Sequence, residues 1–150
     1  MEKIIKKLNK LVGQKVQYAK KSPDTELYDI GFGEMRKTIM YNGSEHSVST
    51  YVIHALCRIK VVFCESSLKK QIKWFDSVSS SEEFSHIENN IIGLEVISID
   101  VNERNCLKVD LGQWVLVFFP NGDDEESWRF FSPYSEEPHL VVSNSWIEIE

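Results

Sequence analysis

The chain repeats a short pattern of apolar residues and glycines, and this repeat constrains the fold more than any other feature of the sequence. Leu11–Val16 (LVGQKV) is echoed by Ile91–Val96 (IIGLEV), 80 residues later. Ile30–Gly33 (IGFG) is echoed by Val109–Gly112 (VDLG), 79 residues later. A fixed period of this kind is typical of a duplicated structural unit. Because apolar residues and glycines recur while no titratable cluster does, the repeat indicates architecture and not chemistry.

The repeat predicts an α+β fold in which two helix-plus-antiparallel-strand repeats pack as one domain. A chain of 150 residues is long enough for one compact domain with its own core. We therefore expect a single domain over residues 1–150, with repeat one at 2–79 and repeat two at 80–150. Each repeat begins with a helix that ends at a glycine, Gly13 or Gly93.

Apolar residues at helical spacing mark the start of each repeat. Residues 4–12 place them on one face, with lysines opposite. Residues 84–91 do the same, and Ser80 with Glu83 forms a capping box before them. Strands are expected at Lys15–Lys20, Glu26–Phe32, Glu95–Val101, Cys106–Leu111, Trp114–Phe119, Glu126–Phe131, His139–Val142 and Trp146–Ile149.

The stretch Val48–Cys64 has the clearest strand pattern. Its odd positions from Tyr51 to Phe63 are all apolar, so one face should line the core. Seventeen residues are too many for one flat strand, and we expect a bend inside it. Asn42-Gly43 and Asn121-Gly122, again 79 residues apart, each predict a hairpin turn.

Charge is distributed unevenly along the chain. Residues 1–75 carry 14 Lys/Arg and 7 Asp/Glu, whereas residues 76–150 carry 3 and 16. Two explanations stay open: attraction between the packed repeats, or a surface that binds a charged partner. The acidic half would repel a phosphate backbone, so a nucleic-acid partner is not expected.

Several features predict a cytoplasmic protein that does not enter the membrane. No apolar run approaches the ~20 residues of a membrane span. Lysines interrupt the apolar residues of 1–10, where a signal peptide would have its hydrophobic region. The three cysteines are odd in number and sparse, as expected for free thiols in a reducing compartment.

Four short motifs spread over most of the chain resemble those of a group of small uncharacterised bacterial proteins. They are Phe32-Gly33, the segment His54–Ile59 (HALCRI), Asp76 after a short strand, and Glu126–Arg129 (ESWR). The resemblance implies a shared fold and no particular activity. Some small bacterial proteins of this size act as immunity factors against toxins, which is an analogy at the level of fold alone.

The sequence offers little to support metal, cofactor or nucleophile chemistry. There is no Cys-x-x-Cys pair, and His54 and Cys57 differ in strand parity, so they should face opposite sides. The acidic run Asp123–Glu126 lacks the alternating ligands of a calcium loop. No nucleophile elbow or phosphate-binding glycine loop is present. We therefore expect no metal, no cofactor and no catalytic residue.

Arg129 is the most distinctive polar residue, because it lies among aromatic residues. Asp76 and Glu126 are its natural partners. It could form a buried salt bridge that fixes how the repeats dock, or join Trp128 and Trp114 in an exposed binding patch. His54 and Arg58 are expected on the solvent-facing side of the long strand. The candidate binding residues are therefore Trp114, Glu126, Trp128, Arg129, His54, Arg58 and Asp76.

These observations leave three functions to consider. The leading one is a non-enzymatic protein-binding module, an immunity-type inhibitor whose acidic half captures a basic protein partner. The second is a small enzyme with a pocket of histidine and carboxylates, lined by His54, Arg58 and Asp76. The third is a homo-oligomeric structural protein that pairs through an edge strand such as Trp146–Ile149. The sequence does not fix the oligomeric state.

Overall fold

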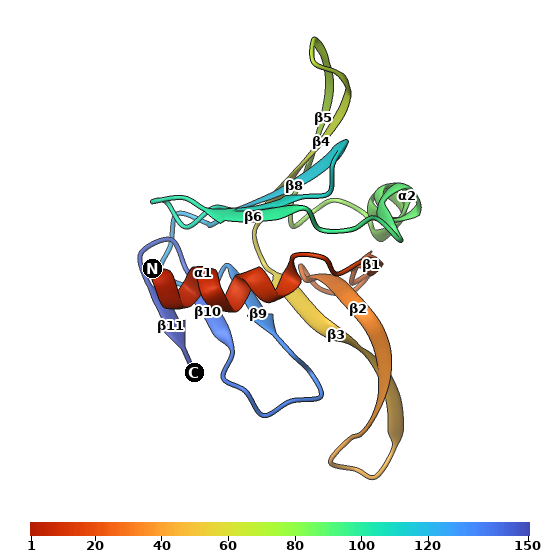
Figure 1. Cartoon of the computed structure of the whole chain (residues 1–150), viewed down its shortest axis with the longest axis vertical. Coiled ribbons are helices and arrows are strands. Elements are labelled where there is room, and N and C mark those ends of the chain that lie inside the picture. The colour runs from red at the N-terminus through yellow and green to blue at the C-terminus, as the bar shows by residue number, and fades with distance from the viewer.

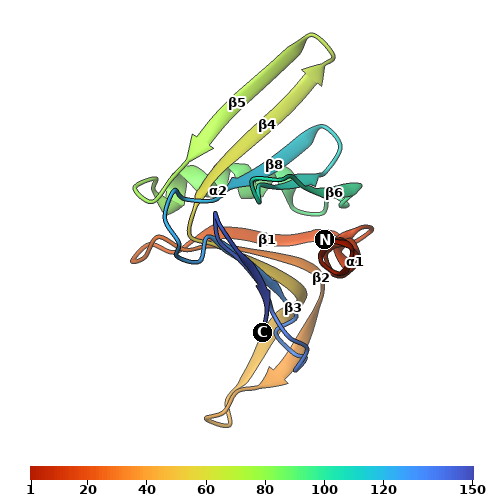
Figure 2. The ribbon, with the colours of Figure 1, turned by 90° about the vertical axis from the view of Figure 1, so that its left-hand side faces the viewer.

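The computed structural model describes residues 1–150 as a mixed fold of helices and strands. Two α-helices and one short 3-10 helix accompany eleven strands in two antiparallel sheets (Figure 1). Figure 2 shows one sheet above the other, with both helices near the seam between them. The presence of both helices and strands, and the antiparallel pairing of the strands, agree with the expected α+β class.

Sheet one has six strands and sheet two has five. The order in sheet one is β1 (Val16–Lys21), β2 (Tyr28–Ile39), β3 (Glu45–Ala55), β9 (Trp128–Phe131), β10 (Leu140–Val142) and β11 (Ile147–Ile149). The order in sheet two is β5 (Lys69–Phe75), β4 (Arg58–Ser66), β8 (Trp114–Phe119), β7 (Leu107–Asp110) and β6 (Ser98–Val101). The chain changes sheets after β3 and returns after β8, so each sheet contains strands from both halves of the sequence.

The helices form where the sequence predicted them. α1 (Glu2–Leu8) runs into the 3-10 turn η1 (Asn9–Leu11), and α2 spans Ser81–Ile91. Ser80 caps α2, since its hydroxyl accepts the amide of Glu83 at 3.0 Å. Both helices end before a glycine with positive φ, 89° at Gly13 and 85° at Gly93. α1 then packs near β6, and α2 packs against β1.

The long apolar stretch lines the core as expected. It bends at residues 56–57, so that β3 belongs to sheet one and β4 to sheet two. Its odd positions stay on the inner side in both sheets: Ile53, Ile59 and Val61 are all buried. One core of 27 buried residues joins the inner faces of both sheets with the two helices.

A short antiparallel contact between residues 13–16 and 93–96 joins the two sheets. The amide of Gly13 donates to the carbonyl of Val96 and the amide of Gly93 to that of Val16, both at 2.8 Å. Val16 donates to Leu94 at 3.0 Å and Val96 to Gln14 at 2.9 Å. Lys15 and Glu95 face each other at the centre. Every hydrogen bond from the first segment therefore has a counterpart from the second.

Two sequence-based expectations about strands need correction. Asn42-Gly43 forms the predicted hairpin, between β2 and β3, but Asn121-Gly122 lies in the crossing from β8 to β9, which are in different sheets. There the side chain of Asn121 donates to the carbonyl of Leu56, in the other crossing, at 2.9 Å. The residue patterns placed no strand at β5, because only Phe75 of its seven residues is buried and a strand outside the core lacks apolar alternation; only the resemblance implied a short strand before Asp76.

Neither α-helix is long and apolar enough to cross a lipid bilayer.

Glu88 closes the outer edge of β1, and its loss should be costly. Its carboxylate accepts the amide of Ala19 at 2.8 Å and lies 3.3 Å from the ammonium of Lys20. Glu88→Ala leaves the buried Ala19 amide without an acceptor, so the free energy of unfolding should fall by about 1–3 kcal/mol in urea melts. Glu103→Ala, at an exposed turn, should change it by less than about 0.5 kcal/mol. Equal losses in the two variants would contradict this role for Glu88.

Candidate functional site

Arg129 anchors a charged network on the outer face of sheet one, the face turned away from sheet two. Its Nε donates to Glu126 at 2.9 Å and its Nη2 to the other oxygen of the same carboxylate. Its Nη1 donates to Nδ1 of His139 at 2.8 Å. The hydrogen bond to Glu126 raises the pKa of Arg129 above its usual value. Glu126 is thus the partner of Arg129, and the ion pair is only partly buried.

His54 lies beside Arg129, because the two residues are opposite each other in the register of β3 and β9. Its Nε2 is 3.4 Å from Oδ1 of Asp29, and this oxygen also accepts the hydroxyl of Tyr18 at 2.9 Å. Burial, and then the charge of Asp29, raise the pKa of Tyr18, which therefore stays protonated as the donor. The structure thus brings together three predicted residues, His54, Glu126 and Arg129, on one sheet face.

The glycine of the repeated pattern makes room for Tyr18. Gly31 pairs with Tyr18 across β1 and β2, and a Cβ on Gly31 would lie 2.2 Å from Cε1 of the Tyr18 ring. The ring can therefore lie across the strand and reach Asp29. The Asp29–His54 pair then faces a shallow hollow of about 430 Å³. A carboxylate that orients an imidazole can support proton transfer near neutral pH.

The predicted patch of Trp128, Arg129 and Trp114 does not form. Trp128 is completely buried, and its indole N–H donates to the carbonyl of Asn105 at 3.0 Å. Arg129 follows Trp128 directly on β9, so their side chains leave opposite faces of sheet one. Trp114 belongs to sheet two.

Asp76 is not in a site with His54 and Arg58. It lies in the turn between β5 and α2, where its Oδ1 accepts the amides of Val78 and Ser79 at 3.0 and 3.1 Å. Its carbonyl accepts the hydroxyl of Tyr28 at 2.6 Å. Asp76 therefore shapes a turn, and the expected cleft of His54, Arg58 and Asp76 does not exist.

Arg58 belongs to a second surface, the outer face of sheet two. Its guanidinium lies 4.4 Å from the ring centre of Trp74, which also contacts the ring of Phe119 at 5.2 Å. Trp74 is 45% exposed and Ile72 is 51% exposed. We call this surface the basic–apolar face; it comprises Val62, Ile72, Trp74, Val115, Val117 and Phe119, with Arg58 and Lys60 at the β4 end and Lys108, Asp100 and Asp110 at the β6–β7 end.

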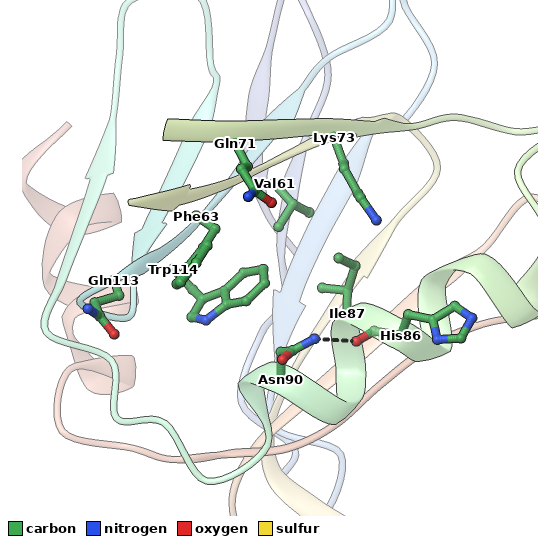
Figure 3. Close-up of a pocket in the computed structure, with 9 residues that line it drawn as sticks. All are labelled: Val61, Phe63, Gln71, Lys73, His86, Ile87, Asn90, Gln113 and Trp114. Carbon is green, nitrogen blue, oxygen red and sulfur yellow. Dashed lines mark hydrogen bonds between the residues drawn. The ribbon is translucent and has the colours of Figure 1, made fainter. Parts of the chain in front are cut away.

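Trp114 lines a cavity on the inner side of the β4–β5 hairpin. Its indole stacks on Phe63, with ring centres 4.7 Å apart and an angle of 28° between the planes. Figure 3 shows the indole reaching across the cavity toward Ile87 and Asn90 of α2. The cavity has a volume of about 480 Å³.

The histidine and cysteine residues considered above as metal ligands or nucleophiles lie apart. His54 points outward from sheet one, whereas Cys57 is buried in the core, as the strand parity predicted. No three histidine, cysteine or carboxylate side chains are grouped so as to hold a metal ion. Burial raises the pKa of Cys57 to about 12, so its thiol is a poor nucleophile at neutral pH.

Sequence reasoning missed several residues of these surfaces. Asp29 and Tyr18 join His54 only through the pairing of three strands, and Lys73 joins Trp114 only because β5 lies beside β4. Strand register is not written in local sequence patterns, so no signal identified these partners in advance.

Comparison of the chain with protein-family models, with curated proteins and with solved structures found no match.

The three thiols should differ in reactivity. Cys57 and Cys106 are buried, whereas Cys64 is half-buried on the outer side of sheet two. With a thiol reagent at about pH 8, the native protein should show one fast thiol, which Cys64→Ser removes, and three on denaturation. A fast reaction in the Cys64→Ser protein would contradict the burial of Cys57 and Cys106.

His139 should titrate below its ordinary pKa. Burial lowers this pKa, and the positive charge of Arg129 lowers it further, because protonation would place two cations at the Nη1–Nδ1 contact. An NMR titration should give a pKa below 6.5 for His139, and a higher value in the Arg129→Met protein. An unchanged pKa in that variant would exclude Arg129 as a cause.

Proposed function

We propose that the chain is a non-enzymatic protein-binding module that docks its partner on the basic–apolar face. Strand β8 carries this proposal. Leu116 and Phe118 are buried in the core, while Val115, Val117 and Phe119 on the opposite side are only half-buried. Central strands that carry apolar residues on both faces usually lie in sheets that are covered on both sides. In this chain only the inner side of β8 is covered.

The composition of this face is that of a binding surface. Tryptophan and arginine supply a large share of binding energy in protein interfaces, and Trp74 with Arg58 forms such a pair in the open. Exposed apolar groups that lie together, bordered by polar ones, mark interaction sites. Covering them would contribute about 25 cal/mol for each Å² of apolar area removed from water.

The charges beside the apolar residues indicate the kind of partner. Arg58 and Lys60 border the apolar residues beside Trp74, and carboxylates of a partner protein would match them there, whereas Lys108 lies opposite Asp100 and two residues from Asp110.

A second surface supports the proposed basic partner and the immunity-type role. Residues 120–150 carry eight carboxylates and one arginine, and they form β9, β10, β11 and the adjoining loops of sheet one. Lys10 pairs with Glu137 at 3.1 Å and Arg129 with Glu126, so most of these carboxylates are free of an internal cation. This acidic end would attract a basic protein in a salt-sensitive way.

The other two functions have weaker support. The His54–Asp29 pair beside its hollow is the basis for the proposal of a small enzyme. Strand β11 is the edge strand that the oligomer proposal would use, but it is three residues long and carries Glu148, and short charged edges discourage pairing.

We further infer a cytoplasmic protein built as one domain from two repeats, as the resemblance to small bacterial proteins also implies. The free state of all three cysteines is consistent with a reducing compartment. The single core favours one domain. The matched hydrogen bonds of 13–16 and 93–96, and the packing of each repeat's helix near the first strand of the other, favour two related repeats.

The proposal is tested by capture of proteins from an extract of the source organism on the immobilised chain. Trp74→Ala should weaken capture of the specific partner by about 30-fold or more at both about 0.1 M and about 1 M salt, because loss of a central tryptophan costs about 2 kcal/mol. Ile39→Ala, which removes an even more exposed apolar residue outside the face, should leave capture unchanged.

The same experiment separates the two surfaces. Partners that bind the acidic end should be lost from the double variant Glu136→Lys/Glu148→Lys, which reverses two of its charges, and also from the unchanged chain at about 1 M salt. The Trp74→Ala variant should still capture these partners. Retention of every captured protein by Trp74→Ala would contradict docking on the basic–apolar face.

A further inference from the structure

The cavity around Trp114 exists because the β4–β5 hairpin extends past the core. The inner side of this hairpin and the start of β8 face α2 across an open space, which Figure 3 shows between Lys73 above and Asn90 below. Its volume of about 480 Å³ falls in the range of small-molecule sites, about 300–1,000 Å³. Trp74 and Ile72 point to the other side of β5, so this cavity is separate from the basic–apolar face.

One wall of the cavity is a stacking surface. Trp114 rests on Phe63, which holds the indole in place. The indole N–H of Trp114 makes no hydrogen bond within the protein, whereas those of Trp128 and Trp146 are donated to backbone carbonyls. A partly exposed aromatic ring of this kind offers a planar ligand a surface on which to stack.

The charged residues of the lining favour an anion. Lys73 is the one permanently charged residue that lines the cavity, and no carboxylate does. Glu65, on the same hairpin, is already paired with Lys69 at 3.6 Å and accepts the amide of Gln71 at 2.9 Å. The ammonium of Lys73 has no partner in the protein and can bind a phosphate as a point charge.

The remaining polar groups are amides, of which one suits the edge of a base. Gln113 is at the rim of the cavity, and its side chain points away from the indole of Trp114 (Figure 3). Asn90 uses its NH2 group on the carbonyl of His86 at 2.7 Å, which leaves its oxygen free to accept.

We propose that this cavity binds a nucleoside monophosphate with an adenine base. The base stacks on Trp114, its amino group donates to the free oxygen of Asn90, and the phosphate meets Lys73. A free nucleotide fits better than a nucleic-acid strand, because the net charge of −6 would repel a chain of phosphates.

The proposal is tested by calorimetry and tryptophan fluorescence with adenosine 5′-monophosphate, adenosine and inorganic phosphate. The monophosphate should bind with a Kd below about 1 mM and quench the fluorescence of Trp114. Lys73→Gln should weaken binding of the monophosphate about tenfold and leave that of adenosine unchanged, since only the former contacts the ammonium. Trp114→Leu should weaken both ligands.

Lys70→Gln is the matched control, because Lys70 lies on the same strand but points to the outer side. It should leave both affinities unchanged, and circular dichroism should show that all variants are folded. The proposal is overturned if the monophosphate does not bind at millimolar concentration, or if Lys70→Gln weakens it as much as Lys73→Gln. Tighter binding of a short oligoadenylate than of the monophosphate would also overturn it.

Discussion

The antiparallel contact between residues 13–16 and 93–96 is the constraint on which the rest of the structure depends. It turns each helix into its first strand at a glycine with positive φ, and it places Val16 and Val96 in the core, each 1% exposed. Because each segment satisfies the backbone groups of the other, neither has a stable position without its counterpart. The stacking of the two sheets and the placement of both helices follow from this contact.

The cavity around Trp114 arises where strands extend beyond the shared core. The β4–β5 hairpin extends above it and the β2–β3 hairpin below it (Figure 2). The β4–β5 extension has no second sheet beneath it, so Trp114 stays accessible. The outer face of sheet two is accessible for another reason, because no element of the chain covers that side of β8. The network of Arg129, His54 and Asp29 is different, because its polar groups satisfy one another on a solvent-facing sheet.

Local sequence patterns predicted which residues lie in the core. They did not predict features that depend on which strands pair in the folded chain. The helix ends, the Ser80 cap and the buried side of the stretch from Val48 to Cys64 are encoded in residue spacing and are present as expected. Strand β5 forms because it pairs with β4, and the chain after Asn121-Gly122 crosses to sheet one instead of turning back. Both depend on strand pairing, which local spacing does not encode. Similarly, Glu126 could be predicted as a partner of Arg129 because the two are three residues apart in the sequence. Asp29 could not be predicted as a partner of His54, because the two meet only through the pairing of β2 with β3.

The exchange of strands between the sheets has a consequence for synthesis on the ribosome. When residues 1–79 have left the exit tunnel, β3 lacks its neighbour β9 and β4 lacks its neighbour β8, since both are encoded later. The N-terminal half therefore presents two open strand borders until β8 and β9 have also been synthesised. Such a nascent chain folds late and as a whole, and during elongation it needs protection from pairing with other chains.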